Sequence, residues 1–495
     1  MRVNFDFWRK HVLYSILLGY GVFANVGLIL ALTGQFQAAY LRLFSILVLI
    51  ASWKTIANHL RLAVRLPQFM GSGRVLAASL FRENAFPKAL TVLWLAVNLF
   101  IVFVPITGTD AKVYHVPIIF DVISTGQANF RPDIRYYHEL PILAEIFYAV
   151  PTAIFNETAA PFVFQVLMYG ALFLFILLFH NFLAQRLRHK FLAAASPLFL
   201  LSLFDLQREI FHGGYIDVFV FLFGLASTLL LLENTTRPEL RRRELWLSAV
   251  LASIAVSMKY IALFFLAVNC IFLTVRFLRE RTGIWALLKI AAIYLLIVFA
   301  VSGYWYIRNV FWFGNPVYPM FSSEEFRTSV GWFAMARTPL NFVLFPFYRF
   351  GSWFSDPLET SSHLVVFGYF ALLYLLLAVF IFIRKHIGMA ALLLFAFIEL
   401  YLAFAFFTTH QIRFMLPALL MLGPLLALLL DRLYCLARER FGDRNYQRLT
   451  KVSMASANIF FLLMFLANFH YFHIRFLYTG GIYTREQYIG SIGSQ

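Results

Sequence analysis

The chain has 495 residues, of which 61% are hydrophobic and 13% are charged, and its formal net charge is +17. A soluble domain keeps about a quarter of its residues charged, so this composition excludes a soluble protein and indicates an integral membrane protein. Apolar segments of helix length exclude a membrane β-barrel, whose strands are about ten residues long and alternate in polarity. The two cysteines, Cys270 and Cys435, lie in or beside apolar segments and give neither a disulfide framework nor a metal signature.

About thirteen apolar segments along the chain are candidates for transmembrane helices. In chain order the predicted spans are Val12–Leu32, Ala38–Ala57, Ala89–Ile106, Phe162–Phe182, Phe191–Phe204, Tyr215–Glu233, Trp246–Met258, Ile261–Arg276, Leu287–Ser302, His363–Ile383, Gly388–Phe407, Phe414–Leu430 and Val452–Phe472. The pattern predicts an all-α polytopic protein with no soluble domain. The spans do not form two matching halves, which counts against a transporter built from inverted repeats.

Basic residues between the spans predict the orientation, because cytoplasmic loops are enriched in Lys and Arg. The main basic segments are Lys54–Lys88, Arg186–Lys190, Arg237–Arg243, Arg279–Arg281, Arg384–His386 and Arg432–Lys451. This distribution explains the net positive charge without a nucleic-acid partner. It predicts a cytoplasmic N-terminus and an outer C-terminal tail.

We therefore divide the chain into three parts. Residues 1–88 hold two spans and a basic cytoplasmic loop. Residues 89–431 form a transmembrane core with long outer loops at 107–161 and 303–362. Residues 432–495 hold a basic cytoplasmic loop, the last span and a short outer tail.

The segment Phe103–Pro161 is the most polar interruption of the apolar pattern, and Asp110 follows directly after a predicted span. Within it, Val116–Ser124 and Pro141–Ala149 have helix-compatible apolar spacing. We expect two short amphipathic helices on the outer membrane surface, apolar faces down. They would hold Asp110 at the mouth of a cavity, with Glu139 at its rim. A lid that becomes ordered only when substrate binds is the alternative.

The predicted topology gathers ionisable and other polar residues at five outer edges. They are Asp110, His115 and Glu139 in the first loop, Arg208, His212 and Asp217 around the turn Asp205–Gly214, Lys259 at the tip of a short hairpin, Arg308 and Asn309 at the start of the second long loop, and His410 and Arg413 before a late span. Charges near hydrocarbon are expensive and are usually retained for a pathway or a site. The outer face is therefore the predicted functional face.

Four motifs resemble those of the GT-C superfamily of bacterial membrane glycosyltransferases, near the family 39 protein-mannosyltransferase-like group. The motifs are Tyr304–Asn309 followed by Phe313–Pro319, Asp110-Ala111 with Tyr114–Pro117, Ser257–Tyr260 and Arg413–Pro417. The resemblance covers about Phe103 to Pro417, and the Arg-Asn/Gly-Asn-Pro pair is its most specific part. Three predicted spans precede the Asp110 loop here, two more than in the simplest family pattern, which has one.

The resemblance implies an inverting transfer of a sugar from a polyprenyl-phosphate donor to a glycan, lipid or protein acceptor, on the outer face of the bacterial inner membrane. It gives Asp110 the role of catalytic base. Residues expected at the donor phosphate are Arg308, Lys259 and Arg413. Residues expected to bind substrate are Tyr114, His115, Glu139, Tyr137, Arg208, His212, Asp217, Asn309 and His410, and Trp305 is a candidate for stacking on a sugar. No cofactor is predicted, while a divalent cation at Asp110 stays open because some branches of the superfamily use one.

Structural explanations exist for several of these residues. Arg308 and Arg413 suit interfacial anchors, whose charged heads reach the headgroups from helix ends. His212 stands beside two glycines, as a turn residue does, and Asp217 can pair with Arg208. Glu139 suits the first turn of a loop helix.

Two other functions remain open. A transporter or flippase of lipid-linked saccharides also needs a basic cavity between apolar helices, but it needs access from both membrane faces. A glycan polymerase or ligase shares the outer-face site and differs mainly in its donor. Clustering of the ionisable residues towards one face favours an enzyme.

Overall fold

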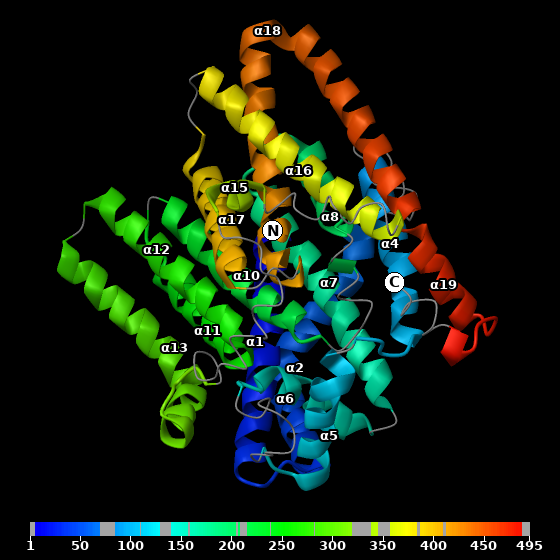
Figure 1. Cartoon of the computed structure of the whole chain (residues 1–495), viewed down its shortest axis with the longest axis vertical. Helices are drawn as coiled ribbons and strands as arrows, with labels where there is room; N and C mark the ends of the chain where they lie inside the picture. Colours follow the sequence, from blue (N-terminus) through cyan, green and yellow to red (C-terminus); the bar gives the residue numbers. More distant parts are fainter. Residues whose placement is uncertain are drawn as a thin grey trace.

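The computed structural model describes residues 5–69, 85–108, 110–128, 140–156, 159–203, 206–207, 215–237, 239–281, 283–318, 338–344, 357–383, 387–408 and 412–487. The secondary structure of this part of the chain is entirely helical (Figure 1). The α-helices are α1 (Phe5–Leu32), α2 (Ala38–Phe69), α4 (Ala85–Asn98), α5 (Val116–Thr125), α6 (Leu143–Phe155), α7 (Ala160–Ala184), α8 (Lys190–Leu201), α10 (Asp217–Thr236), α11 (Arg242–Met258), α12 (Leu263–Glu280), α13 (Ile284–Phe313), α15 (Pro339–Leu344), α16 (Pro357–Phe382), α17 (Met389–Thr408), α18 (Leu416–Ala467) and α19 (Phe469–Thr479). Shorter pieces are the 3₁₀ helices η1 (Leu99–Phe103), η4 (Tyr260–Ala262) and η7 (Ile412–Met415) and the π-helix η2 (Ala111–His115).

Among the described residues, eight helical segments are long and apolar enough to cross a membrane. They are Val12–Leu32, Ala160–Ala184, Asp217–Thr236, Tyr260–Glu280, Ile284–Phe313, Met389–Phe407, Leu416–Arg444 and Tyr446–Ala467. These segments indicate a membrane-embedded protein, as the composition predicted. The count of thirteen spans stays a prediction, because several predicted spans coincide with shorter apolar helices such as α4 and α8.

Helix α10 occupies the centre of the bundle (Figure 1). Its side chains from Asp217 to Thr235 are all buried, and it packs against α7, α11, α12 and α17. A helix that is apolar on every side needs protein or lipid around its whole circumference. In this chain neighbouring helices supply that cover, so α10 is the element around which the outer helices are arranged.

The end of α13 differs from the sequence prediction. We predicted that this helix ended at Ser302 and that Arg308 and Asn309 opened the second long loop. That boundary is wrong, because α13 continues through both residues to Phe313 and Gly314 then ends it with a φ of 66°. The intervening aromatic and aliphatic residues all tolerate helix, whereas glycine adopts this left-handed conformation without a Cβ clash.

The two helices expected in the first loop both exist, but the setting of the second, α6, is not the one predicted. Helix α5 covers the predicted segment, whereas α6 begins two residues after Pro141. We expected α6 to lie on the membrane surface with one apolar face down. Instead every side chain from Leu143 to Val150 is buried, because α6 packs among α1, α2, α5 and α7. Arg42 at the start of α2 also donates two hydrogen bonds to the carbonyl oxygen of Ile154 near the end of α6.

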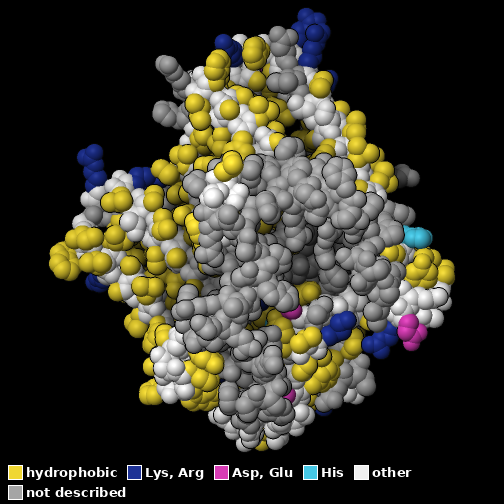
Figure 2. All heavy atoms as spheres, viewed as in Figure 1, with side chains coloured by type: hydrophobic (Ala, Val, Ile, Leu, Met, Phe, Trp, Pro, Cys, Tyr) yellow, Lys and Arg dark blue, Asp and Glu magenta, His cyan; other side chains and the backbone are white. Residues whose placement is uncertain are grey.

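The two ends of the molecule differ in charge and shape. Helix α18 reverses direction at Gly442, where φ is 74°, and its two arms form an arch at the top of Figure 1. Lys and Arg side chains gather on this arch in Figure 2, and the exposed ones include Arg438, Arg440 and Arg444. Helix α5 and the C-terminal end of α13 lie towards the opposite, lower end of the view. The segments that carry Asp110 and Arg308 therefore lie far from the basic arch.

Candidate functional site

Asp110 directly precedes one turn of π-helix. Its backbone is right-handed helical, and the amide of Val116 closes the turn by donating to the carbonyl of Ala111, five residues earlier. The same spacing separates Asp110 from His115, so these two residues lie about one turn apart on one side of the segment. Single π turns within helices often occur at functional sites. Asp110 is half-buried, while His115 is buried.

His115 forms a buried pair with Glu145 of α6. Its Nδ1 lies 2.7 Å from the Glu145 Oε1, and the two side chains are 2% and 4% exposed. The remaining polar atoms of the pair, His115 Nε2 and Glu145 Oε2, are buried without a hydrogen-bond partner. The predicted substrate-binding residue His115 is thus tied to an acid that the sequence analysis did not select. We call His115 and Glu145 the His115 pair.

Lys259 lies where the chain breaks between α11 and α12, as its predicted position at a hairpin tip requires. Its backbone is extended, with φ −163° and ψ 145°, and its Nζ lies 2.7 Å from Oδ1 of Asp217. Asp217 is 1% exposed and opens α10, where the helix N-terminus favours a carboxylate. Lys259 also lies over the ring of Phe414, 5.3 Å from its centroid.

This ion pair gives Asp217 a partner that the sequence analysis did not name. Asp217 was assigned either to substrate or to a pair with Arg208; Arg208 lies outside the described residues, so that pairing stays a prediction, and the described partner is Lys259, whose side chain is 18% exposed. A buried carboxylate needs such a cation, because removing it from water without compensation is costly. Lys259 therefore reaches the predicted phosphate-binding region already oriented by a buried acid.

Arg308 and Asn309 are joined to the same region by hydrogen bonds. Arg308 donates from Nε and Nη2 to the Asn309 Oδ1, at 3.0 and 2.8 Å. The Asn309 Nδ2 donates to the hydroxyl of Tyr260 at 2.6 Å, and that hydroxyl donates to the carbonyl of Tyr318 at 3.0 Å. Tyr260 follows Lys259 directly in the chain. Two motifs that are far apart in sequence, Ser257–Tyr260 and the segment from Arg308 to Tyr318, therefore meet at Asn309.

The guanidinium of Arg308 lies between two indole rings. Its Cζ is 5.0 Å from the ring centroids of both Trp305 and Trp312. Contacts of this kind add about 0.5–2 kcal/mol and orient the cation. An interfacial anchor also combines Arg with Trp, but an anchor does not need the link through Asn309 to Tyr260.

Aromatic packing connects the Asp110 segment with the Lys259 segment. Phe219, two residues after Asp217, has its ring centroid 4.7 Å from that of Phe147 and 5.6 Å from that of Tyr148. Phe147 and Tyr148 follow Glu145 closely on α6. Helix α6, which carries Glu145 of the His115 pair, therefore packs directly against the start of α10, which carries Asp217, the partner of Lys259.

Several predicted residues cannot be placed. Tyr137, Glu139, Arg208, His212 and His410 lie outside the described residues. Arg413 lies in η7, one residue before Phe414, but its side chain is outside the described part. Tyr114 is buried, with its ring 4.0 Å from that of His115.

Sequence reasoning missed Glu145 and underused Tyr260. Glu145 is the single charged residue in a run of apolar side chains from Leu140 to Val150, and an isolated acid in such a run is itself a signal. Tyr260 lies in the motif Ser257–Tyr260, but within that motif only Lys259 was assigned a function.

The divalent cation left open at Asp110 stays a prediction, since Glu139 of the same loop lies outside the described residues. Among the residues that the structure describes, the His, Cys, Asp and Glu side chains near Asp110 do not form a group of three with ligand spacing. We therefore derive no step of the chemistry through a cation.

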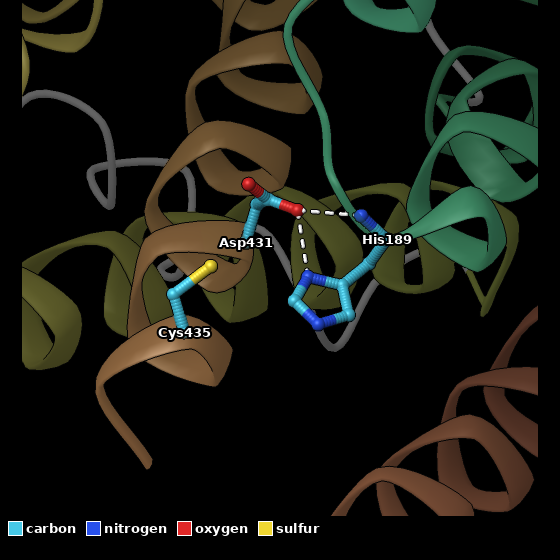
Figure 3. Close-up of side chains that lie close together, drawn as sticks. All are labelled: His189, Asp431 and Cys435. Carbon is cyan, nitrogen blue, oxygen red and sulfur yellow. Dashed lines mark hydrogen bonds and ion pairs between the residues drawn. The ribbon is translucent and has the colours of Figure 1, made fainter. Parts of the chain in front are cut away.

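A second His–carboxylate contact lies near the basic end (Figure 3). Asp431 Oδ1 accepts hydrogen bonds from the backbone amides of Arg188 and His189, at 2.9 and 2.8 Å, and from His189 Nδ1 at 2.7 Å. The other ring nitrogen of His189 contacts the hydroxyl of Tyr446. These bonds attach both arms of α18 to the connection between α7 and α8. We call His189 and Asp431 the His189 pair.

Cys435 lies beside the His189 pair, and the three side chains are close enough to hold a metal ion. Their ligand atoms lie within 4.8 Å of one another. Both ring nitrogens of His189 and one oxygen of Asp431 are already engaged, however, and the Cys435 Sγ accepts from Arg188 at 3.9 Å. A cation would have to displace these hydrogen bonds, so the arrangement is complete as a structural contact.

Comparisons of this chain with protein-family models, with curated proteins and with solved structures find no match. The assignment of a function therefore rests on the chemistry of the residues described above.

Proposed function

We propose that this chain is an inverting membrane glycosyltransferase that takes a sugar from a polyprenyl-phosphate donor. The observation that carries the proposal is the meeting of two cationic segments at Asn309 and Tyr260. Lys259 directly precedes Tyr260 and is oriented by Asp217, while Arg308 on α13 is oriented by Asn309. A lipid phosphate leaving group needs fixed cations at headgroup depth, because negative charge develops on it as the bond breaks.

In the proposed reaction Asp110 accepts the proton of an acceptor hydroxyl. The hydroxyl oxygen bonds to the anomeric carbon on the face opposite the phosphate, while the bond between that carbon and the phosphate oxygen breaks. The electron pair of the broken bond stays on the phosphate, where Arg308 and Lys259 stabilise it, and Arg413 is proposed as a third cation. Because attack and departure occur on opposite faces, the anomeric configuration inverts. A positioned carboxylate typically contributes a factor of about 100 to 10,000 to such a step.

We further propose about thirteen spans in the bacterial inner membrane, with the Asp110 and Arg308 segments on the outer face. The separation of these segments from the basic arch of α18 supports this orientation (Figures 1 and 2). Single cysteines introduced at Lys112 and at Asn315 should both react with an impermeant thiol reagent added outside intact cells. Labelling of one position from outside and the other only after permeabilisation would refute this topology.

The donor site is tested with the protein in lipid nanodiscs and undecaprenyl phosphate as the binding probe. Arg308→Ala should weaken binding about 10- to 150-fold, since it removes charge-assisted hydrogen bonds worth about 1.5–3 kcal/mol. Arg308→Lys should retain part of the affinity because the charge remains. Arg438→Ala, on the exposed arch at the other end, is the matched control. Equal binding by wild-type protein and Arg308→Ala would make Arg308 an interfacial anchor.

Transfer is tested with a panel of polyprenyl-phosphate sugars, by following release of the lipid phosphate. Release that depends on an added acceptor supports the transferase. Movement of intact lipid-linked saccharide across the bilayer, with the sugar bond unbroken, would instead establish the flippase alternative.

A further inference from the structure

The His115 pair contains two polar atoms whose hydrogen bonds are unfilled. His115 Nε2 and Glu145 Oε2 are buried, and neither has a hydrogen-bond partner. The two residues are 1% and 3% exposed, so bulk water does not reach them. A buried polar atom without a partner costs about 1–3 kcal/mol. If the pair served only to join η2 to α6, hydrogen-bond partners for these two atoms would make the fold more stable.

The contact at His115 Nδ1 determines the chemistry that is open to His115 Nε2. The 2.7 Å contact between His115 Nδ1 and Glu145 Oε1 fits the tautomer in which Nδ1 carries the hydrogen and the carboxylate accepts it, because an ionised carboxylate can only accept hydrogen bonds. In the neutral ring Nε2 then has a free lone pair. A carboxylate bound at Nδ1 also stabilises the imidazolium that forms when Nε2 takes a proton, as in other enzymes with a carboxylate–histidine couple.

The position of the pair links it to the proposed base. Asp110 and His115 lie about one turn apart on the π turn. During sugar transfer the departing phosphate gains the electron pair of the sugar bond, while Asp110 gains the proton of the acceptor. Asp110 must lose this proton before the next turnover.

We propose that the His115 pair receives this proton from Asp110. The inference rests on the proposed glycosyl transfer. The proton moves from the acceptor oxygen to the Asp110 carboxylate and then to His115 Nε2, and it returns to solvent when the products leave. The imidazolium formed is neutralised by Glu145 at 2.7 Å. His115 and Glu145 act through Asp110, so they are positioning residues rather than groups that touch the substrate.

The first test is independent of activity. Nitrogen NMR of protein labelled with 15N-histidine, in nanodiscs, reports which ring nitrogen carries the hydrogen, and His115→Gln identifies the His115 signals by their loss. We expect a protonated Nδ1 and a bare Nε2, and we expect Glu145→Gln to shift both signals. A bare Nδ1 with a protonated Nε2 would overturn the proposal, because Nε2 could not accept a proton.

The second test is chemical rescue of turnover. His115→Ala should lower lipid-phosphate release about 100-fold, the lower end of what acid–base groups contribute, with undecaprenyl phosphate binding unchanged. Added imidazoles should restore release in the order of their basicity. His180→Ala, which removes a half-buried histidine outside the His115 pair, is the control and should show neither effect. Unchanged turnover in His115→Ala, or equal rescue by weakly and strongly basic rings, would overturn the relay.

The proposed glycosyl transfer and the proton transfer to His115 can be refuted separately. If wild-type protein releases no lipid phosphate from any donor, the proposed function fails, and the NMR measurement still decides whether Nε2 can accept a proton. If wild-type protein is active and only the rescue fails, the transferase stands and the relay is wrong.

Discussion

The His115 pair and the His189 pair share one contact, between a histidine Nδ1 and a carboxylate oxygen, and differ in the hydrogen bonds of their remaining polar atoms. In both pairs a histidine Nδ1 lies 2.7 Å from a carboxylate oxygen. Around His189 the remaining ring nitrogen contacts Tyr446, and Asp431 also accepts two backbone amides. Around His115 the remaining nitrogen and the second oxygen of Glu145 have no partner, although the pair is more deeply buried.

The difference separates structural contacts from reactive ones. Filled hydrogen bonds stabilise a fold, and the His189 pair accordingly attaches the two arms of α18 to the α7–α8 connection. An unfilled lone pair held in a low dielectric interacts strongly with any proton donor that reaches it. We therefore assign chemistry to the lower end of the molecule and a structural role to the contact near the arch.

The largest expected effect on stability belongs to Lys259 and Asp217, which form an ion pair at 2.7 Å inside the proposed site. Replacing one member, as in Asp217→Asn or Lys259→Met, leaves the other charge without its partner and should lower the free energy of unfolding by about 3–5 kcal/mol. The double variant should recover most of this loss. Unfolding titrations in mixed detergent measure all three variants.

The same variants separate stability from donor binding. Undecaprenyl phosphate binding should survive in Asp217→Asn, which keeps the cation, and should be lost in Lys259→Met and in the double variant. Recovery of binding along with stability in the double variant would show that Lys259 only balances Asp217.

A smaller loss of unfolding free energy is expected for variants of the His189 pair. Asp431→Ala removes the acceptor of three hydrogen bonds and should lower the free energy of unfolding by about 3 kcal/mol. Lipid-phosphate release by the folded fraction should remain at the wild-type rate. A turnover defect larger than the loss of folded protein would break the comparison, because it would give the His189 pair a part in the chemistry.

The smallest loss of unfolding free energy is expected for a variant of Tyr446. Tyr446→Phe removes one hydroxyl from His189 Nε2 and should cost about 1 kcal/mol of unfolding free energy. It also makes the His189 pair resemble the His115 pair at the ring nitrogen. Imidazole rescue is nevertheless not expected in a His189→Ala protein, because this pair lies near the basic arch and far from Asp110, and an increase of turnover on adding imidazole would contradict the distinction.

The sequence was sufficient for local features and insufficient for tertiary ones. The interruption at Lys259 and the helix at α5 followed from short-range apolar patterns. The burial of α6 did not, because an apolar segment looks alike whether lipid or protein covers it. The end of α13 was misplaced because the predicted span ended at Ser302, whereas the helix continues to Phe313 and the left-handed turn falls at Gly314.

The interaction partners of the site residues were the hardest feature to predict from the sequence. His115 was selected from its motif, but Glu145 lies 30 residues away on another helix, and only the folded chain brings the two together. Likewise the sequence analysis did not name Lys259, 42 residues away, as a partner of Asp217, and only the folded chain brings these two together. Spacing along a chain predicts contacts within a helix, and it gives little information about which helices meet.

The most direct test of the central claim is lipid-phosphate release by Asp110→Asn in nanodiscs, measured with a polyprenyl-phosphate sugar that the wild-type protein uses. Asp121→Asn is the matched control, because it makes the same change on α5, just after the turn that follows Asp110. The account predicts a loss of at least about 100-fold in Asp110→Asn, with unchanged donor binding, and a wild-type rate in Asp121→Asn. Release by Asp110→Asn at the wild-type rate would contradict it.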